Sequence, residues 1–97
     1  MILYIDTSDN KKIVIKLGKH RLVRLIEVGE TQKLLGLINR IIKKVGTSIN
    51  RIDEIKVNLG PGSFTGLRVG VSVANTLGWA LKIPVNGKRQ IVTPIYE

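Results

Sequence analysis

The 97-residue chain contains no cysteine, few aromatic residues and few acidic ones. Without cysteine it can form neither disulfides nor thiolate metal sites, which fits a reducing compartment. Aromatic residues make up 4% of the sequence, so isoleucine, valine and leucine must fill the core. No apolar run approaches the roughly 18 residues that a membrane span requires, and Asp6 interrupts the short apolar stretch at the amino terminus. We therefore expect one soluble, cytoplasmic domain that does not bind membranes.

Positive charge is what the sequence has in excess. Sixteen lysines and arginines against seven acidic residues give a formal net charge of +9. The cations are spread along the chain, with pairs at 11–12, 43–44 and 88–89. Such a field attracts RNA or acidic proteins at long range. The alternative is a merely solubilising surface, and the sequence leaves both open because it does not show whether the cations gather in three dimensions.

Hydrophobic periodicity predicts the element order β-β-β-α-β-α-β. The predicted strands are 2–8, 12–17, 21–28, 54–59 and a short one at Val85, and the predicted helices are 31–46, capped by Thr31 and stopped by Gly46, and about 66–81. Residues 88–97 are predicted to form an extended tail, because Pro94 and β-branched residues oppose a helix. We expect residues 1–97 to form a single α/β lobe of the ribonuclease H-like class, the unit found in actin, sugar kinases and Hsp70. Its mixed five-stranded sheet carries two main helices.

The most distinctive stretch is GPGSFTGLR, at the turn between the fourth strand and the second helix. Its glycines permit close approach, and the N–H groups and hydroxyls that follow are suited to binding an anion. Known nucleotide loops do not match, because no Lys-Ser/Thr pair follows the glycines and Thr65 stands where the last glycine of G-x-G-x-x-G belongs. The alternative is a structural turn in which Thr65 caps the helix. The candidate residues for anion or partner contact are Gly60, Pro61, Gly62, Ser63, Phe64, Thr65, Gly66 and Arg68.

The sequence offers no catalytic or metal-binding constellation. The single His20 has no second histidine or cysteine with which to form a metal site. A ribonuclease H-type nuclease needs several acidic groups that converge on Asp6. The fourth strand instead carries Asn58 near its end, and Asp53 and Glu54 lie at its opposite end. We therefore expect no catalytic residues, no metal and no cofactor.

Both predicted helices carry more apolar surface than contact with one sheet requires. The apolar arc of the first helix spans roughly 160°, against about 100° for a helix that lies on one sheet, so either part of it faces a partner or the helix is deeply buried in the core. In the second helix, small residues spaced four apart form a stripe that another helix can approach closely, and we assign Val69, Val73 and Leu77 to the sheet-facing side. The stripe is covered either by the first helix or by another subunit. The predicted interface residues are Leu34, Ile38, Ile41, Leu67, Gly70, Val71, Ala74 and Gly78.

The stretch GPGSFTGLRVGVSVANTLGWAL, preceded by ILYIDTS, closely resembles the TsaB (YeaZ) family over roughly residues 1–85. That family takes part in making threonylcarbamoyladenosine in tRNA. The resemblance implies a partner and not a catalyst, because TsaB-like proteins are inactive paralogues of TsaD, the metal-dependent subunit that modifies adenosine 37. It also implies pairing with TsaD through the two helices, homodimers through the same surface when isolated, and a TsaE-like ATPase that joins the assembly.

The chain departs from the family in its length. Family members normally continue into a second lobe, whereas here VTPIYE resembles their carboxyl-terminal P-x-Y segment. We expect a natural short form without the cleft between lobes where a nucleotide sits in this superfamily. The leading hypothesis is a non-catalytic scaffold that activates TsaD. The alternatives are a basic module that contacts tRNA and, third, a nucleotide-hydrolysing enzyme.

Overall fold

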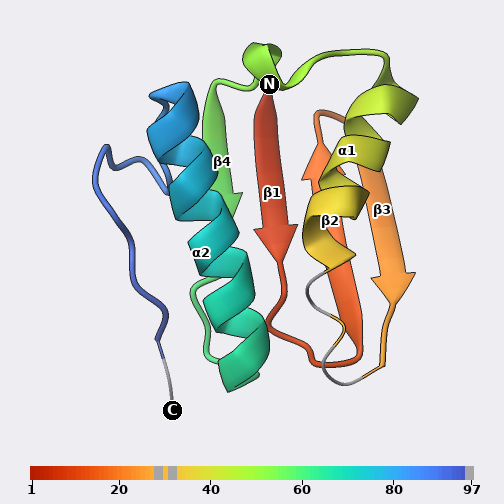
Figure 1. Ribbon diagram of the computed structural model, residues 1–97, viewed down its shortest axis with the longest axis vertical. Helices are drawn as coiled ribbons and strands as arrows, with labels where there is room; N and C mark the ends of the chain where they lie inside the picture. Colours follow the sequence, from red (N-terminus) through yellow and green to blue (C-terminus); the bar gives the residue numbers. More distant parts are fainter. Residues whose placement is uncertain (28–29, 31–32, 96–97) are drawn as a thin grey trace.

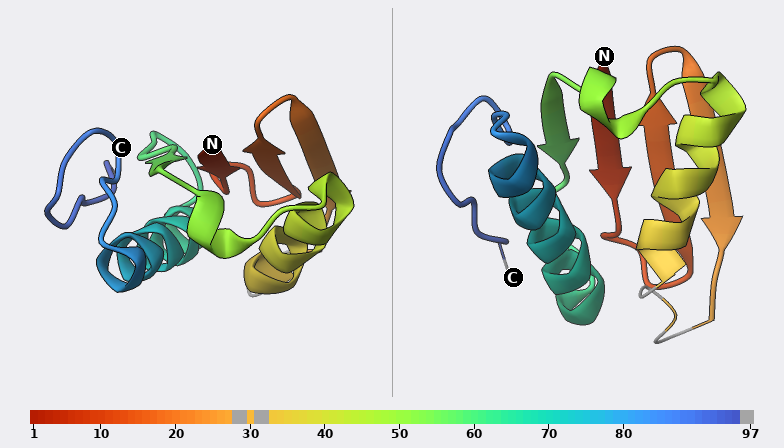
Figure 2. Two further views of the ribbon diagram at one scale, coloured as in Figure 1. Left: turned by 90° about the horizontal axis from the view of Figure 1, so that it is seen from above. Right: turned by 45° about the horizontal axis from the view of Figure 1, so that its top comes forward.

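The computed structural model describes residues 1–27, 30 and 33–95. In chain order its elements are β1 (Ile2–Asp6), β2 (Lys12–Leu17), β3 (His20–Leu25), α1 (Leu34–Val45), the 3₁₀ turn η2 (Ile49–Arg51), β4 (Glu54–Val57) and α2 (Phe64–Leu81). The strands form one sheet in the order β3-β2-β1-β4. Both helices lie on the same face of this sheet, so the described chain has two layers and leaves one sheet face open (Figures 1 and 2).

Alternating apolar residues set the register of the sheet. In the antiparallel pair β1–β2, Leu3 lies opposite Leu17 and Ile5 lies opposite Ile15. Strand β4 joins the other edge of β1 in parallel, with Leu3 opposite Ile55. A parallel neighbour requires a long crossover, which the connection through α1 provides. The predicted mixed α/β architecture is therefore confirmed.

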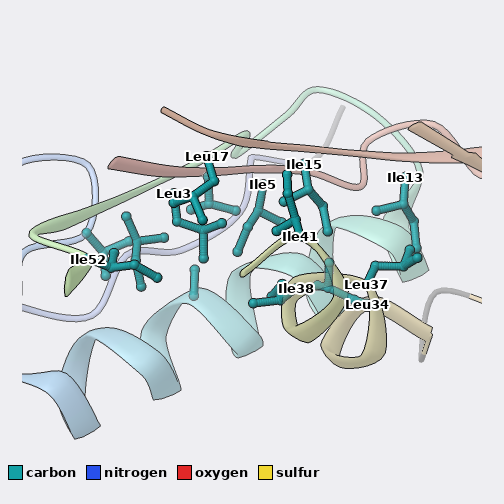
Figure 3. Close-up of a cluster of buried hydrophobic side chains, with 14 of the residues drawn as sticks. Leu3, Ile5, Ile13, Ile15, Leu17, Leu34, Leu37, Ile38, Ile41 and Ile52 are labelled. Carbon is teal, nitrogen blue, oxygen red and sulfur yellow. The ribbon is translucent and has the colours of Figure 1, made fainter. Parts of the chain in front are cut away.

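The core lies between the sheet and the two helices. Helix α1 packs on β2 and β3, and α2 packs on β1 and β4 (Figure 1). Figure 3 shows side chains of the sheet, such as Ile13 and Ile15, pointing toward Leu34 and Ile41 of α1. These four side chains are at most 1% exposed. Aliphatic residues fill the core, as the scarcity of aromatic residues predicts.

Helix α1 ends where the sequence predicts. Gly46 adopts a left-handed conformation with φ of 80°, and its N–H donates to the carbonyls of Ile42 and Lys43. A glycine in this position satisfies carbonyls that the helix itself leaves free. Two predicted boundaries, Thr31 as the N-cap and Val28 as the end of the third strand, lie outside the described residues. Among the described ones, β3 ends at Leu25.

The predicted fifth strand is reduced to isolated bridges of Val85. This residue pairs in parallel with Ile55 and antiparallel with Lys88. The next residue, Asn86, has φ of 52° and turns the chain away from the sheet. Its side-chain amide then takes the place of a strand, because its Oδ1 accepts from the Val57 N–H (2.8 Å) and its Nδ2 donates to the Val57 carbonyl (3.1 Å). The sheet therefore has four strands and not the five predicted.

Helix α2 faces the sheet most closely with its small-residue stripe and not with the side predicted, whose residues pack only partly against the core. Its buried residues are Gly66, Leu67, Gly70, Val71, Ala74 and Gly78, whereas Val69, Val73 and Leu77 are half-buried. The small residues let the helix sit close to the sheet, because a Cβ at Gly70 or Gly78 would overlap Thr7 or Val85. More than one side of this helix is apolar, so the sequence pattern does not show which side packs more closely on the sheet. No described helix is long and apolar enough to cross a membrane.

This orientation corrects the predicted partner interface. The predicted residues are all buried in the core of the chain itself: Leu34, Ile38, Ile41, Leu67, Gly70, Val71, Ala74 and Gly78. Those with side chains larger than hydrogen are at most 3% exposed. Their assignment to an outer surface is therefore wrong, because the sheet already covers them.

The last described segment runs back along α2 without helix or strand, next to the helix in both views of Figure 2. The side chain of Asn75 holds it in two directions. Its Nδ2 donates to the Val92 carbonyl (2.9 Å), and its Oδ1 accepts from the Val92 N–H (3.0 Å). This pair anchors the segment to the middle of α2, where Val92 is buried.

Core and surface positions on α2 are distinguished by one pair of substitutions. Ala74→Arg places a charge where Ala74 is 0% exposed, and we expect it to destabilise the isolated chain by about 3 kcal/mol or more. Ser72→Arg, at an exposed position of the same helix, is expected to change stability by less than about 0.5 kcal/mol. Urea unfolding followed by circular dichroism measures both. A folded, unperturbed Ala74→Arg monomer would contradict the observed orientation of α2.

Candidate functional site

The glycine-rich turn, residues 60–66, closes over the end of β1. The Ser63 N–H donates to the carbonyl of Ser8 (2.7 Å), and the Asn58 N–H donates to the carbonyl of Ile5 (2.9 Å). The Asn58 side chain accepts from the N–H of Gly60 (2.9 Å), which starts the turn. The turn is thus hydrogen-bonded to the residues that follow two neighbouring strands of the sheet, β1 and β4.

Thr7, directly after β1, clamps the first turns of α2. Its hydroxyl donates to the carbonyl of Gly66 (2.6 Å), and Thr7 is fully buried. A Cβ at Gly66 would overlap the Thr7 carbonyl, and a Cβ at Gly70 would overlap the Thr7 hydroxyl. At Gly62, a Cβ would lie 2.6 Å from the Ser8 carbonyl, closer than real side chains approach. These glycines are therefore needed for packing, which supports the structural reading of the turn.

Ser63, and not Thr65, is the N-cap of α2. Its Oγ accepts from the Gly66 N–H (3.3 Å), and helix α2 already begins at Phe64. The predicted cap is wrong because the helix starts two residues earlier than predicted, which leaves Thr65 exposed in its first turn. Phe64 is also exposed, and the Arg68 guanidinium lies 5.4 Å from the centre of its ring. Anion binding by this turn stays a prediction.

Asp6 is a carboxylate with several donors at the end of β1. One oxygen accepts from the Ser8 N–H (2.9 Å) and the Ser8 hydroxyl (2.6 Å), and the other accepts from the Tyr4 hydroxyl (3.3 Å). Burial raises the pKa of Asp6, but hydrogen bonds from Ser8, Asn58 and Tyr4 outweigh this effect and lower the pKa below its ordinary value. The carboxylate is therefore ionised at neutral pH, and both of its oxygens accept hydrogen bonds from within the chain.

The structure places the other chemically notable side chains apart from Asp6. His20 is exposed at the start of β3, and Asp53 and Glu54 lie at the opposite end of the neighbouring strand. In the part of the chain that the structure describes, no three histidine, cysteine, aspartate or glutamate side chains are grouped as metal ligands. The hydrogen bonds around Asp6 can orient the turn. For catalysis or metal binding this end of the sheet offers a single carboxylate.

Sequence reasoning missed Thr7 and Ser8. It included both in a strand that extends to Ser8, whereas β1 ends at Asp6. The signal was the pair of hydroxyl residues after an aspartate at the end of a buried strand, a combination typical of turns that bond to the backbone. Their partners Gly66 and Asn58 lie 59 and 50 positions away in the sequence, so periodicity does not reveal them.

Comparison with known proteins defines the class first. A family model described as "TsaD: tRNA N6-adenosine threonylcarbamoyltransferase" matches residues 29–90, which include both helices, β4 and the glycine-rich turn. The tRNA N6-adenosine threonylcarbamoyltransferase of Nitrosospira multiformis is 46% identical over 56 residues, 58% of this chain and 16% of that protein. The fold and the turn are thus those of a family of tRNA-modification proteins.

Within this class the similarity is to proteins named TsaB or YeaZ. The TsaB of Haemophilus influenzae is 32% identical over 87 residues, which is 87% of this chain and 37% of that protein. The structure of YeaZ from Pseudomonas aeruginosa superimposes with a TM-score of 0.75 at 29% identity, over 87% of this chain and 41% of that one. The chain belongs to the TsaB (YeaZ) family. It spans less than half the length of these relatives.

The need for glycine at the Thr7 clamp is tested by a matched pair of alanine substitutions. Gly70→Ala pushes a methyl group into the Thr7 hydroxyl, and we expect a loss of about 1–3 kcal/mol in unfolding free energy. Gly36→Ala, in α1 with open space at the new Cβ, is expected to add about 0.5–1 kcal/mol. Urea unfolding measures both values. Equal effects of the two substitutions would contradict the clamp.

The donors around Asp6 predict an acid-sensitive contribution to stability. Because the native pKa of Asp6 lies below the ordinary value of 3.8, the unfolded chain binds a proton before the native chain does. This contribution is fully present above pH 3.8 and is lost as the pH falls through the lowered native pKa. Asp6→Asn is therefore expected to destabilise the chain at neutral pH and to match the unaltered chain in acid.

Unfolding curves measured at a series of pH values test this expectation. Ser8→Ala serves as the companion variant, because it keeps the carboxylate and removes the hydroxyl that donates at 2.6 Å. It is expected to move the loss of stability to higher pH. A difference between Asp6→Asn and the unaltered chain that persists at the lowest pH would show that the effect is not one of ionisation.

Proposed function

We propose that this chain is a non-catalytic TsaB-like subunit that takes part in threonylcarbamoylation of tRNA adenosine 37 by binding and activating a TsaD-like protein. The match of residues 29–90 to the family model carries the proposal, since that segment contains both helices. The relative from Haemophilus influenzae is named a tRNA threonylcarbamoyladenosine biosynthesis protein. We assign the lobe to the ribonuclease H-like class, which its element order and mixed sheet support, and we place its activity in the cytoplasm.

The outer sides of the helices are the surface we assign to the partner. We define the outer helical surface as Leu35, Phe64, Val69, Val73 and Leu77. Leu35 and Phe64 are 57% and 55% exposed, and the other three side chains are half-buried. A hollow of about 440 Å³ lies along the same side of α2, and Phe64, Val69 and Val73 contribute to its lining. Exposed and half-buried apolar side chains on the helices of a small domain support a protein contact there.

The environment of Asp6 supports a non-catalytic role. Its carboxylate is engaged by Ser8 and Tyr4 within the chain, and the residues hydrogen-bonded to it are neutral donors. Metal-assisted hydrolysis uses several acidic groups at one point, and Asp53 and Glu54 lie at the far end of the neighbouring strand. The proposal also includes a homodimer through the outer helical surface when no TsaD-like protein is present, and a TsaE-like ATPase that joins through the complex.

Association with TsaD from the same organism tests the proposal. We expect Val73→Arg to weaken the complex at least tenfold, because it places a cation in the hollow beside Phe64. Val23→Arg, on β3 at the opposite face of the sheet, is the control and is expected to leave the affinity unchanged. Light scattering and calorimetric titration measure both. A complex that neither substitution weakens, or no complex at all with the unaltered chain, would contradict the proposal.

A further inference from the structure

The open face of the sheet carries a row of basic side chains. Residues alternate between the two faces of a strand, and directly paired residues share a face. The register pairs Arg21 of β3 with Lys16 of β2, and Lys16 with Tyr4 of β1. Tyr4 in turn pairs with Lys56 of β4. We call these four residues the basic row, which crosses the whole sheet over roughly 14 Å at the usual spacing of strands.

The cations of the basic row have no ionic partner in the described chain. Lys16, Arg21 and Lys56 are exposed. The ion pairs among the described residues join other groups, the amino terminus with Asp53 and Lys33 with Glu30. Lys16 and Arg21 lie directly opposite each other, where like charges destabilise a sheet. The basic row therefore lowers the stability of the free protein, and an anionic ligand would offset this cost.

Two acidic residues share the open face without neutralising the basic row. Asp6 already accepts hydrogen bonds from Ser8 and Tyr4. Glu54 is half-buried at the start of β4 and forms no ion pair with a described residue. Lys12, exposed on β2, adds a further cation to the same face. The open face as a whole is therefore positively charged.

The positive charge of this face indicates an anionic ligand. This face also carries the exposed apolar side chains Ile2, Val23 and Leu25, but the line that crosses all four strands consists of three cations and Tyr4. A nucleic-acid strand offers one phosphate charge about every 3.4 Å along its axis, so several phosphates fit along the basic row. We propose that the basic row binds the phosphate backbone of tRNA. That the nucleic acid is a tRNA rests on the proposed function.

The two faces of the sheet keep the two ligands apart. The outer helical surface lies on one side of the molecule and the basic row on the other, as the left view of Figure 2 shows for the layers themselves. A protein partner on the helices therefore leaves the basic row accessible. The chain then adds phosphate contacts to a complex whose modifying site lies on the partner.

The contact is with the backbone and not with bases. The Lys16 ammonium lies 5.2 Å from the centre of the Tyr4 ring, and the Tyr4 hydroxyl donates to Asp6 (3.3 Å). The ring and the hydroxyl of Tyr4 are therefore engaged within the protein and offer no free platform for base stacking. Phosphate contacts position a nucleic acid without reading its sequence. Affinity that does not depend on base sequence follows from this arrangement.

Fluorescence anisotropy with the intact chain and a labelled, unmodified tRNA transcript tests the proposal. The row variant combines Lys16→Gln, Arg21→Gln and Lys56→Gln. The control variant combines Arg40→Gln, Lys43→Gln and Lys44→Gln, which changes the same residue types at exposed positions of α1. Each variant lowers the formal charge of +9 by three. We expect the row variant to weaken binding on the order of 100-fold near 0.1 M salt and to reduce the salt slope by about 2–3, and the control to change affinity less than about threefold.

Several results would overturn the proposal. Equal losses in the two variants would mean that net charge and not the basic row binds tRNA. Unchanged binding by the row variant would mean that the basic row has no part in it. If the row variant loses affinity for polyglutamate but keeps its affinity for tRNA, the face takes an acidic protein instead. Circular dichroism checks folding, and the single variants Arg21→Gln and Lys56→Gln replace the triple one if it unfolds.

The same variants separate this inference from the proposed function. We expect the row variant to bind TsaD as tightly as the unaltered chain does. Loss of tRNA binding in the row variant together with unaltered binding to TsaD is the outcome that supports the basic row. Absence of TsaD binding by the unaltered chain, with tRNA binding still dependent on the basic row, counts against the proposed function alone.

Discussion

The structure depends on how closely α2 approaches the end of β1. Thr7 donates its hydroxyl to the carbonyl of Gly66, and hydrogen atoms at Gly66 and Gly70 leave the only space that Thr7 can occupy. This contact sets the rotation of α2 about its axis. It therefore decides that small residues face the sheet and that Val69 and Val73 are only half-buried beside the core.

The partner surface that we propose depends on this rotation. Small residues directed at the sheet let α2 pack closely on it, and the larger side chains of Val69, Val73 and Leu77 are half-buried beside the core. The glycines of the motif thus set the position of α2, and Phe64 of the same motif belongs to the outer helical surface that we propose for the partner. The turn that looks like an anion site is explained by the packing of its glycines against Thr7 and Ser8.

A sheet that is covered by helices on one side has a second face, which does not need to be apolar. Its core face needs aliphatic residues, whereas its open face is free to carry charge, and here the register lines up Arg21, Lys16 and Lys56 around Tyr4. This asymmetry separates the two contacts that we propose, an apolar one with a protein and an electrostatic one with a phosphate backbone. It also places four cations of the chain, Lys12, Lys16, Arg21 and Lys56, on one face of the sheet.

The sequence by itself determined the strands β1 to β4, both helices, the Gly46 stop and the aliphatic core, because alternation and helical periodicity are local properties. It also identified the family through the glycine motif. Only the tertiary structure decided which side of α2 is buried, since both sides are apolar and the difference lies in a contact with Thr7, 59 positions away from Gly66. The tertiary structure likewise replaced the fifth strand by the Asn86 turn and brought dispersed cations into one row. Each of these outcomes depends on pairing between distant segments, which no local pattern records.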